Sequence, residues 1–347
     1  MIPVEEKISF ASDYLEGAHP DVMNRLVTTN LLKSPGYGSD SFSAAASQKI
    51  LEACSCPNGA VYFLSGGTQT NVTVIDALLP QYEGAMAAES GHISVHEAGA
   101  IEVSGHKVLT LPSHAGKVDP AEVEAYIDSL QHDENHDHMV MPGLLYISQP
   151  TEFGTLYTKA ELTALSKICH DRGVKLYVDG ARLAYALAAE TNDVTLVDLG
   201  ACCDAFYIGG TKCGALFGEA VVLPQKDLIP HFFTIIKQHG ALFAKGRILG
   251  VQFDELFTND LYYRLGKPAI VAARRIQDTL EEKGYTLLFR SPTNQVFVIM
   301  DNDVMKVLQE KVEFSYWEAY DVTHTVVRFA TSWATTVADV ERLQSAL

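Results

Sequence analysis

The stretch Tyr177–Arg182, which reads YVDGAR, decides how this chain is expected to fold. It closes one short apolar run, and Gly209–Lys212, which reads GGTK, follows a second apolar run at Ala205–Ile208. Short apolar runs bounded by glycine are typical of buried strands. Ligands of open α/β sheets bind outside the carboxyl ends of the strands. Asp179 and Lys212 are therefore expected to lie at one ligand site.

The rest of this region repeats the same pattern, with strand-like segments alternating with helix-like ones. The expected strands cover residues 60–64, 84–88, 144–148, 174–178 and 204–208. Helices are expected to begin near Thr68, Asp119 and Thr158, and the last two are each followed three residues later by a glutamate that fits a helix-capping arrangement. This alternation predicts an α/β fold with a mostly parallel sheet flanked by helices.

Beyond about Phe257 the pattern changes to a long helix, several short strands and a closing helix. We interpret this part as a smaller α+β domain. The expected division is a large domain over residues 1–256, which includes an N-terminal arm, and a small C-terminal domain over residues 257–347.

The composition excludes several kinds of partner. The formal net charge is -17, and no cluster of Lys and Arg is present to neutralise a nucleic-acid backbone. No apolar stretch has the roughly 20 residues of a membrane helix, and residues 1–10 lack the signal-peptide pattern. The six cysteines lack metal-ligand spacing. We therefore expect a cytoplasmic protein that binds no nucleic acid, membrane or metal ion.

A glycine-rich turn follows the expected strand at 60–64. Residues 65–71 read SGGTQTN and lead into an apolar helix. A tight turn at a helix N-terminus presents backbone amides and the positive end of the helix dipole to an anion. Gly66, Gly67 and Thr68 are therefore candidate phosphate ligands, although the common nucleotide motifs are absent. An ordinary glycine turn with Thr68 as the helix cap is the alternative.

The three strand-end features together suit pyridoxal phosphate. The aldehyde of this cofactor forms an imine with a lysine amine, which Lys212 can provide. Its ring nitrogen stays protonated beside a carboxylate, which Asp179 can provide. Taken alone, Asp179 could cap the next helix and Lys212 could be a solvated side chain. Their combination with the glycine turn predicts the cofactor.

Histidine and arginine residues near other strand ends are further candidates. His92 lies between an expected strand and a short helix, where an imidazole can stack on a flat ring and move protons. His96 is the competing candidate, and both could instead be structural. Arg182 and Arg328 carry the planar group that matches the α-carboxylate of an amino acid, with surface salt bridges as the alternative.

Several motifs occur in a characteristic order along the chain. They are Ser12-Asp13, Gly36-Tyr37-Gly38, Ser65–Asn71, His92 with Glu97-Ala98-Gly99, Val178–Arg182, Lys212, and Val327-Arg328. This order resembles the threonine aldolase and aromatic β-eliminating lyase family of fold-type-I pyridoxal-phosphate enzymes. The resemblance covers nearly the whole chain. It implies the fold-type-I architecture, in which a mostly parallel sheet flanked by helices is joined to a smaller C-terminal α+β domain.

The resemblance implies a role for each candidate residue. Lys212 would hold the cofactor as an imine, Asp179 would pair with its ring nitrogen, and His92 would stack on the ring. The implied phosphate ligands are Gly67 and Thr68, with Gly66 beside them. The implied ligands of the substrate carboxylate are Ser12, Arg182 and Arg328, and Arg182 would also contact the cofactor.

Family members are homodimers or homotetramers with shared sites. The resemblance therefore implies that Tyr37 and Arg247 are contributed by the neighbouring subunit. Tyr37 would contact the substrate, and Arg247 would reach the phosphate of the partner's cofactor.

Two positions depart from the family pattern. Matching aldolases carry a Ser-Lys step at the imine lysine, where this chain has Thr211-Lys212. The loop in which they place a histidine near the substrate hydroxyl reads SQPTEFG at Ser148–Gly154, with Glu152 at the corresponding position. Either Glu152 takes over the proton transfer or the substrate differs.

The implied function is retro-aldol cleavage of a β-hydroxy-α-amino acid of threonine, allo-threonine or phenylserine type to glycine and an aldehyde. The implied catalytic residues are Lys212, Asp179, His92 and Glu152. A β-eliminating lyase that releases pyruvate and ammonia is the alternative. A non-catalytic binding protein on the same fold is a third interpretation.

Overall fold

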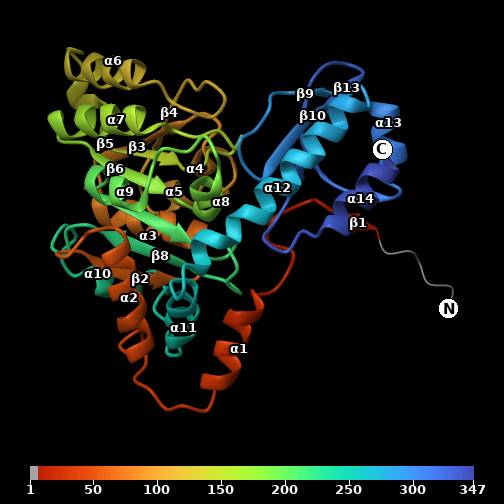
Figure 1. Ribbon diagram of the computed structural model, residues 1–347. Coiled ribbons are helices and arrows are strands. Elements are labelled where there is room, and N and C mark those ends of the chain that lie inside the picture. The colour runs from red at the N-terminus through yellow and green to blue at the C-terminus, as the bar shows by residue number, and fades with distance from the viewer. Residues whose placement is uncertain (1–6) are drawn as a thin grey trace.

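A seven-stranded sheet forms the centre of the larger part of the molecule (Figure 1). The computed structural model describes residues 7–347. The strand order is β2-β8-β7-β6-β5-β3-β4, and β8 is antiparallel to both neighbours whereas the other pairs are parallel. The strands are β2 (Ala60–Leu64), β3 (Glu83–Ala88), β4 (Val108–Leu111), β5 (Met141–Ser148), β6 (Lys175–Asp179), β7 (Ala205–Gly209) and β8 (Glu219–Leu223). The predicted mostly parallel α/β sheet is confirmed.

Helices pack on both faces of this sheet. Helices α3, α5 and α10 contribute to the core on one face, and α6, α7 and α9 contribute to the core on the other. The helices that precede the small domain are α1 (Pro20–Thr29), α2 (Ser41–Ala53), α3 (Gly67–Leu78), α4 (His92–Val95), α5 (Ala100–Val103), α6 (Pro120–Gln131), the 3-10 helix η1 (His136–His138), α7 (Lys159–Asp171), α8 (Leu183–Ala188), α9 (Leu196–Cys202), α10 (Phe232–Gln238) and α11 (Arg247–Leu256).

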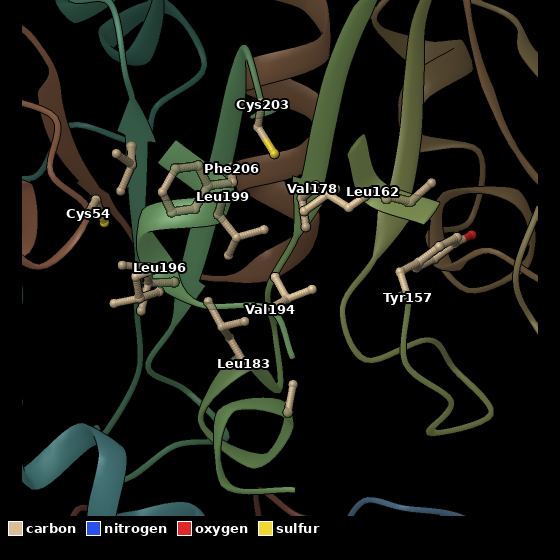
Figure 2. Close-up of a cluster of buried hydrophobic side chains, with 14 of the residues drawn as sticks. Cys54, Tyr157, Leu162, Val178, Leu183, Val194, Leu196, Leu199, Cys203 and Phe206 are labelled. Atoms are coloured by element: carbon tan, nitrogen blue, oxygen red, sulfur yellow. The ribbon is translucent and has the colours of Figure 1, made fainter. Parts of the chain in front are cut away.

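Alternate side chains of the central strands fill the two cores. Val178 and Phe206 belong to one core, and Tyr177 and Tyr207 belong to the other. Figure 2 shows the first core, where Phe206 lies beside Leu199 of α9. Strands covered on both faces are apolar on both sides, which explains why these segments read as continuous apolar runs in the sequence.

The first turn of α3 differs from those of the other predicted helices. Thr158 caps α7 through a capping box with Glu161, as predicted, and Asp119 caps α6. Gly66, rather than Thr68, occupies the N-cap of α3, and no side chain caps that helix. The first amides of α3 are therefore left for another acceptor.

The smaller part of the molecule is built on a four-stranded antiparallel sheet with the order β12-β13-β10-β9. Helix α12 (Leu261–Glu282) runs between the two parts (Figure 1). The other elements are β9 (Thr286–Leu287), β10 (Gln295–Asp301), α13 (Asn302–Leu308), β11 (Val312–Glu313), β12 (Ser315–Ala319), β13 (His324–Ala330) and α14 (Val337–Ala346). The predicted smaller α+β unit is confirmed.

The N-terminal arm lies on this smaller unit. Strand β1 (Ile8–Ser9) pairs in parallel with β11, and the ring centre of Phe10 is 6.3 Å from that of Phe329. The arm, which we expected to accompany the large domain, thus packs in the core of the small one. The domain boundary between residues 256 and 257 stays a prediction.

Strands β5, β6 and β7 run parallel, so their carboxyl ends meet at one edge of the sheet. Ser148 of β5 is in register with Asp179 of β6, and the turn that carries Lys212 follows β7. The residues that follow the central strands in the sequence therefore lie together at this edge.

Candidate active site

A cavity of about 260 Å³, which we call the inner cavity, lies at the carboxyl edge of the sheet. It brings together the predicted residues Gly67, Thr68, His92, Glu152, Asp179, Arg182 and Lys212. The other residues that line it are Tyr14, Ser148, Pro150, Ala181, Tyr207, Thr211 and Glu219. Asp179 and Lys212 thus share one cavity, and their chemical roles there stay predictions.

Lys212 lines the inner cavity from the turn after β7. Burial lowers the pKa of its amine, and the Arg182 guanidinium lowers it further. The carboxylates of Asp13, Asp179 and Glu219 act in the opposite direction and offset only part of this effect. A lysine with a lowered pKa is deprotonated more often at neutral pH and is then a nucleophile.

Asp179 ends β6 and accepts four hydrogen bonds. Its Oδ1 accepts from the Tyr207 hydroxyl at 2.5 Å and from the Ala181 amide at 2.9 Å. Its Oδ2 accepts from the Tyr146 hydroxyl at 2.6 Å and from Asn71 Nδ2 at 3.1 Å. Four donors match the acceptor capacity of an ionised carboxylate, and two of them are hydroxyl groups that can rotate toward other partners. Asp179 therefore presents a positioned negative charge to the cavity.

The imidazole of His92 is connected to Asp179 through two buried side chains. His92 Nδ1 lies 2.7 Å from Glu97 Oε1, a partner that favours a proton on Nδ1 and leaves Nε2 for a ligand. Asn71 Nδ2 donates to the same Glu97 oxygen at 2.7 Å and to Asp179 at 3.1 Å. Because these bonds join α3, α4 and β6, they hold the imidazole in one orientation at the cavity.

Glu152 is a buried carboxyl group, 8% exposed, in the loop after β5. Its Oε1 accepts hydrogen bonds from the Ser148 hydroxyl at 2.7 Å and from the His92 amide at 3.0 Å. Burial raises the pKa of Glu152, and the bonds from Ser148 and the backbone offset part of this rise. The small domain supports the same loop, because Gln295 Nε2 donates to the Glu152 carbonyl at 3.3 Å. Glu152 is therefore held where a carboxyl group can exchange a proton with a ligand.

Arg182 is already occupied by a buried ion pair with Asp13. Its Nε and one terminal nitrogen donate to the two Asp13 oxygens at 2.6 and 3.0 Å, and Asn294 donates to the same carboxylate at 2.9 Å. Burial alone would raise the pKa of Asp13, but the charges of Arg182 and Lys212 outweigh it and hold this pKa well below its usual range. Arg182 is therefore a less available anion receptor than its position suggests.

A second cavity of about 570 Å³, the outer cavity, shares Tyr14, His92, Glu152, Arg182 and Lys212 with the inner one. Its remaining lining residues are Ser90, Val95, His96, Phe153, Ser315, Tyr316, Trp317, Glu318 and Arg328. The two cavities therefore adjoin, and the outer one extends from the sheet edge to strands β12 and β13 of the small domain.

Arg328 is a half-buried cation that forms no ion pair with an acid in the described part of the chain. Its guanidinium donates to Gln295 Oε1 at 3.0 Å, to the Ala11 carbonyl at 3.2 Å and to the Ser315 hydroxyl at 3.3 Å. Its Nε is buried and has no hydrogen-bond partner within residues 7–347. Burial and then the charge of Arg182 lower the pKa of Arg328 to about 10. An incoming carboxylate would supply the missing charge and hydrogen bonds.

Four predicted site residues line neither cavity. Gly66 contributes the N-cap of α3, and the Ser12 hydroxyl is buried without a partner among residues 7–347. Tyr37 is 42% exposed, and Arg247 donates to two backbone carbonyl groups. Tyr37 and Arg247 were predicted to serve a neighbouring subunit, and this stays a prediction.

Several residues that lie at the site have no role in the predictions made from the sequence. They are Asp13, Tyr14, Tyr146, Tyr207, Glu219 and Trp317. A signal existed for Tyr146 and Tyr207, because each lies two residues before a strand end and therefore shares a sheet face with the end residue. Asp13 and Trp317 had no such local signal, since their segments reach the site only through tertiary packing.

The described residues provide no site for a metal ion and no membrane span. Within residues 7–347, no group of three or more His, Cys, Asp or Glu side chains is placed to hold a metal ion. In the same range, no helix combines the length and the apolar character needed to cross a membrane.

The residues around the inner cavity fit pyridoxal phosphate. Lys212 provides an amine with a lowered pKa, Asp179 provides a buried negative charge, and His92 provides a positioned ring. Gly67 and Thr68 begin α3, whose first amides lack a capping side chain. Amides of this kind bind phosphate groups.

The comparisons with known proteins agree with this arrangement. The family model "Beta-eliminating lyase" matches residues 9–303. A low specificity L-threonine aldolase from Pseudomonas aeruginosa is 29% identical over 341 residues, which cover 96% of this chain and 94% of that protein. The structure of a Leishmania major threonine aldolase is 40% identical, with a TM-score of 0.93 and coverage of 97% of both chains. An aspartate aminotransferase from Thermus thermophilus shares the fold, with 14% identity, a TM-score of 0.71 and coverage of 98% of this chain and 91% of that chain. The chain belongs to the beta-eliminating lyase family, which its motifs resemble.

Proposed function

We propose that this protein is a pyridoxal-phosphate-dependent aldolase that cleaves a β-hydroxy-α-amino acid to glycine and an aldehyde. The main support for this proposal is that Lys212, Asp179 and the first turn of α3, which has no capping side chain, line the same cavity. The relatives from Pseudomonas aeruginosa and Leishmania major are named threonine aldolases. The substrate class we propose is therefore that of threonine, allo-threonine and phenylserine.

Each end of the cofactor has a matching group in the inner cavity. Lys212 would hold it covalently, Asp179 would pair with its ring nitrogen, and His92 would stack on the ring. The first amides of α3 would bind its phosphate. When bound, pyridoxal phosphate accepts the electron pair of the broken Cα–Cβ bond.

Arg328 is the strongest candidate for binding the substrate carboxylate. Arg328 forms no ion pair with an acid of the described chain, although the charge of Asp13 acts on it, whereas Arg182 is already paired with Asp13. A guanidinium that binds a carboxylate through two parallel hydrogen bonds also orients the substrate. Holding the breaking bond in the reactive orientation contributes several kcal/mol to catalysis. The unpartnered Ser12 hydroxyl, next to Asp13, is a secondary candidate for the same carboxylate.

Glu152 is our candidate for the base that removes the proton of the substrate β-hydroxyl. It lines both cavities, so it lies between the cofactor site and the space left for the substrate side chain. Ser148 and the His92 amide hold one carboxyl oxygen, which leaves the other to meet the substrate. As that proton leaves, the Cα–Cβ bond can break to release the aldehyde.

Replacing Glu152 with Gln is expected to lower kcat for cleavage by about 100-fold, because the amide keeps the size of the side chain but cannot accept a proton. The wild-type rate should rise with pH as Glu152 ionises, and burial should place this rise above the range of an exposed glutamate. Measuring aldehyde release from acidic to neutral pH checks both points. A variant that keeps the wild-type pH profile would point to another base, with His96 of the outer cavity the first alternative.

A β-elimination is the second candidate function, since the matching family model is named for that reaction. Both reactions would use the same cofactor-binding residues, but they release different products. In the decisive experiment, the purified protein is incubated with pyridoxal phosphate and threonine, allo-threonine or phenylserine, and glycine, 2-oxo acids and ammonia are quantified. We expect glycine and an aldehyde in equal amounts. A 2-oxo acid and ammonia without glycine would establish the elimination instead; the 2-oxo acid would be 2-oxobutanoate from threonine or allo-threonine and phenylpyruvate from phenylserine. No product from any substrate would favour a binding protein.

We further propose a homodimer or homotetramer in which Tyr37 and Arg247 serve the site of the neighbouring subunit. This proposal rests on the family resemblance and on the position of both residues outside the cavities of their own chain. The protein is proposed to act in the cytoplasm on a small amino acid, without nucleic acid or membrane as a partner.

A further inference from the structure

Glu219, the first residue of β8, is a buried carboxyl group beside the lysine. It is 3% exposed, is in register with Gly209 at the end of β7, and lines the inner cavity together with Lys212. Its Oε2 accepts from the Gly210 amide at 3.0 Å, and its Oε1 accepts from the Thr211 hydroxyl at 2.7 Å. Both donors belong to the segment between β7 and Lys212. The carboxyl group therefore faces that segment.

The three carboxylates that act on the Lys212 amine are Asp13, Asp179 and Glu219, and they differ in what else they bind. Asp13 forms a two-point ion pair with Arg182. Asp179 accepts four hydrogen bonds and is our candidate partner of the cofactor ring. Glu219 meets only neutral donors, and the cation that acts on it is Lys212. Asp13 and Asp179 act more strongly on the amine than Glu219 does, but Glu219 is the one of the three whose hydrogen bonds hold the turn that carries the lysine.

The pKa of Glu219 differs from that of an exposed glutamate. Burial raises its pKa to about 7, while the bonds from Thr211 and Gly210 and the charge of Lys212 act in the opposite direction. The titratable groups that interact electrostatically with Glu219 are Lys212, Asp179, Tyr177, Tyr207, Cys213 and Tyr262. Burial raises the pKa of the three tyrosines and of the cysteine, so these four groups stay neutral near pH 7.

We propose that Glu219 is a positioning residue for Lys212, which fixes the turn that carries the lysine and sets how readily its amine loses a proton. The inference rests on the proposed function in one respect, which is that Lys212 is the reacting amine. A nearby carboxylate stabilises the ammonium form. Ionised Glu219 therefore offsets part of the lowering of the Lys212 pKa by burial. As a result, a larger fraction of Lys212 stays protonated than in a purely apolar cavity.

The test compares Glu219→Gln with Glu219→Asp in the whole chain without cofactor. Gln keeps the size and most of the hydrogen bonding but removes the charge, whereas Asp keeps the charge and shortens the side chain. Trace acetylation with acetic anhydride over a pH series, read by mass spectrometry of the Lys212 peptide, gives the pH at which half of the amine is deprotonated. Gln is expected to lower this midpoint by about 1 pH unit, a tenfold change in proton affinity, and Asp is expected to leave it near that of wild type.

Two results would overturn the proposal. An unchanged midpoint in Glu219→Gln would mean that the carboxylate charge does not reach the lysine. An equal fall in both variants would mean that the shape of the turn, and not the charge, controls the amine. The visible absorbance of the wild-type chain, read after incubation with pyridoxal phosphate and removal of the unbound cofactor, tests the proposed function separately. Its absence would contradict the cofactor assignment, while the acetylation midpoints would still decide the role of Glu219.

Discussion

Replacing Lys212 with Ala is expected to abolish both turnover and the visible absorbance that bound pyridoxal phosphate gives the protein. Alanine has no amine to hold the cofactor covalently, so the rate of glycine release should fall by at least about a thousandfold. The fold should persist, because the substitution removes a buried amine whose ionisation is opposed by its surroundings. Absorbance spectra and glycine assays of the purified variant check the two expectations together.

Lys167→Ala is a matched control for this experiment. Lys167 is exposed on α7, where it forms an ion pair with Asp171 one helical turn away. Exposed pairs of this kind contribute about 1 kcal/mol or less to stability, so the control should keep both absorbance and rate. An imine band that survives in Lys212→Ala, and that borohydride reduction converts to a stable covalent adduct, would show that another amine holds the cofactor.

Asp179→Asn is expected to lower kcat/KM by about two to four orders of magnitude. The amide has nearly the same shape, but it carries no charge to keep the cofactor ring nitrogen protonated. It also places a donor group among the four donors that now converge on the carboxylate. The steady-state rates of wild type and variant, measured with saturating pyridoxal phosphate, give the size of the loss.

Tyr207→Phe separates the charge of Asp179 from its hydrogen bonding. This variant removes the donor to Oδ1 but leaves the carboxylate ionised with three other donors. Loss of one such bond is worth about 1 to 3 kcal/mol at a charged group, so the rate should fall much less than in Asp179→Asn. Equal losses in the two variants would contradict a specific role for the negative charge.

The main residues of the site could be predicted because each follows a local pattern. Asp179 comes directly after an apolar run, Lys212 follows another one after a short glycine turn, and Gly67 precedes an apolar helix. In a parallel sheet the direction of each strand brings such positions to one edge without any knowledge of long-range contacts. The chemistry of a lysine and an acid at that edge then pointed to the cofactor.

The contacts that set the charges in the site could not be predicted in this way. Arg182 pairs with Asp13, 169 residues earlier in the chain, only because the N-terminal arm crosses to the sheet edge. Glu219 contacts the turn that carries Lys212 because β8 runs back antiparallel to β7, and no local pattern marks that reversal.

The sequence by itself therefore determined the layered α/β architecture and the strand-end lysine, acid and glycine turn, because hydrophobic periodicity and turn chemistry act over a few neighbouring residues. Only the tertiary structure decided which arginine is paired with an acid and which carboxylates act on the lysine. Those choices depend on burial and on charges brought together from distant segments, and such energies arise only when the chain is folded.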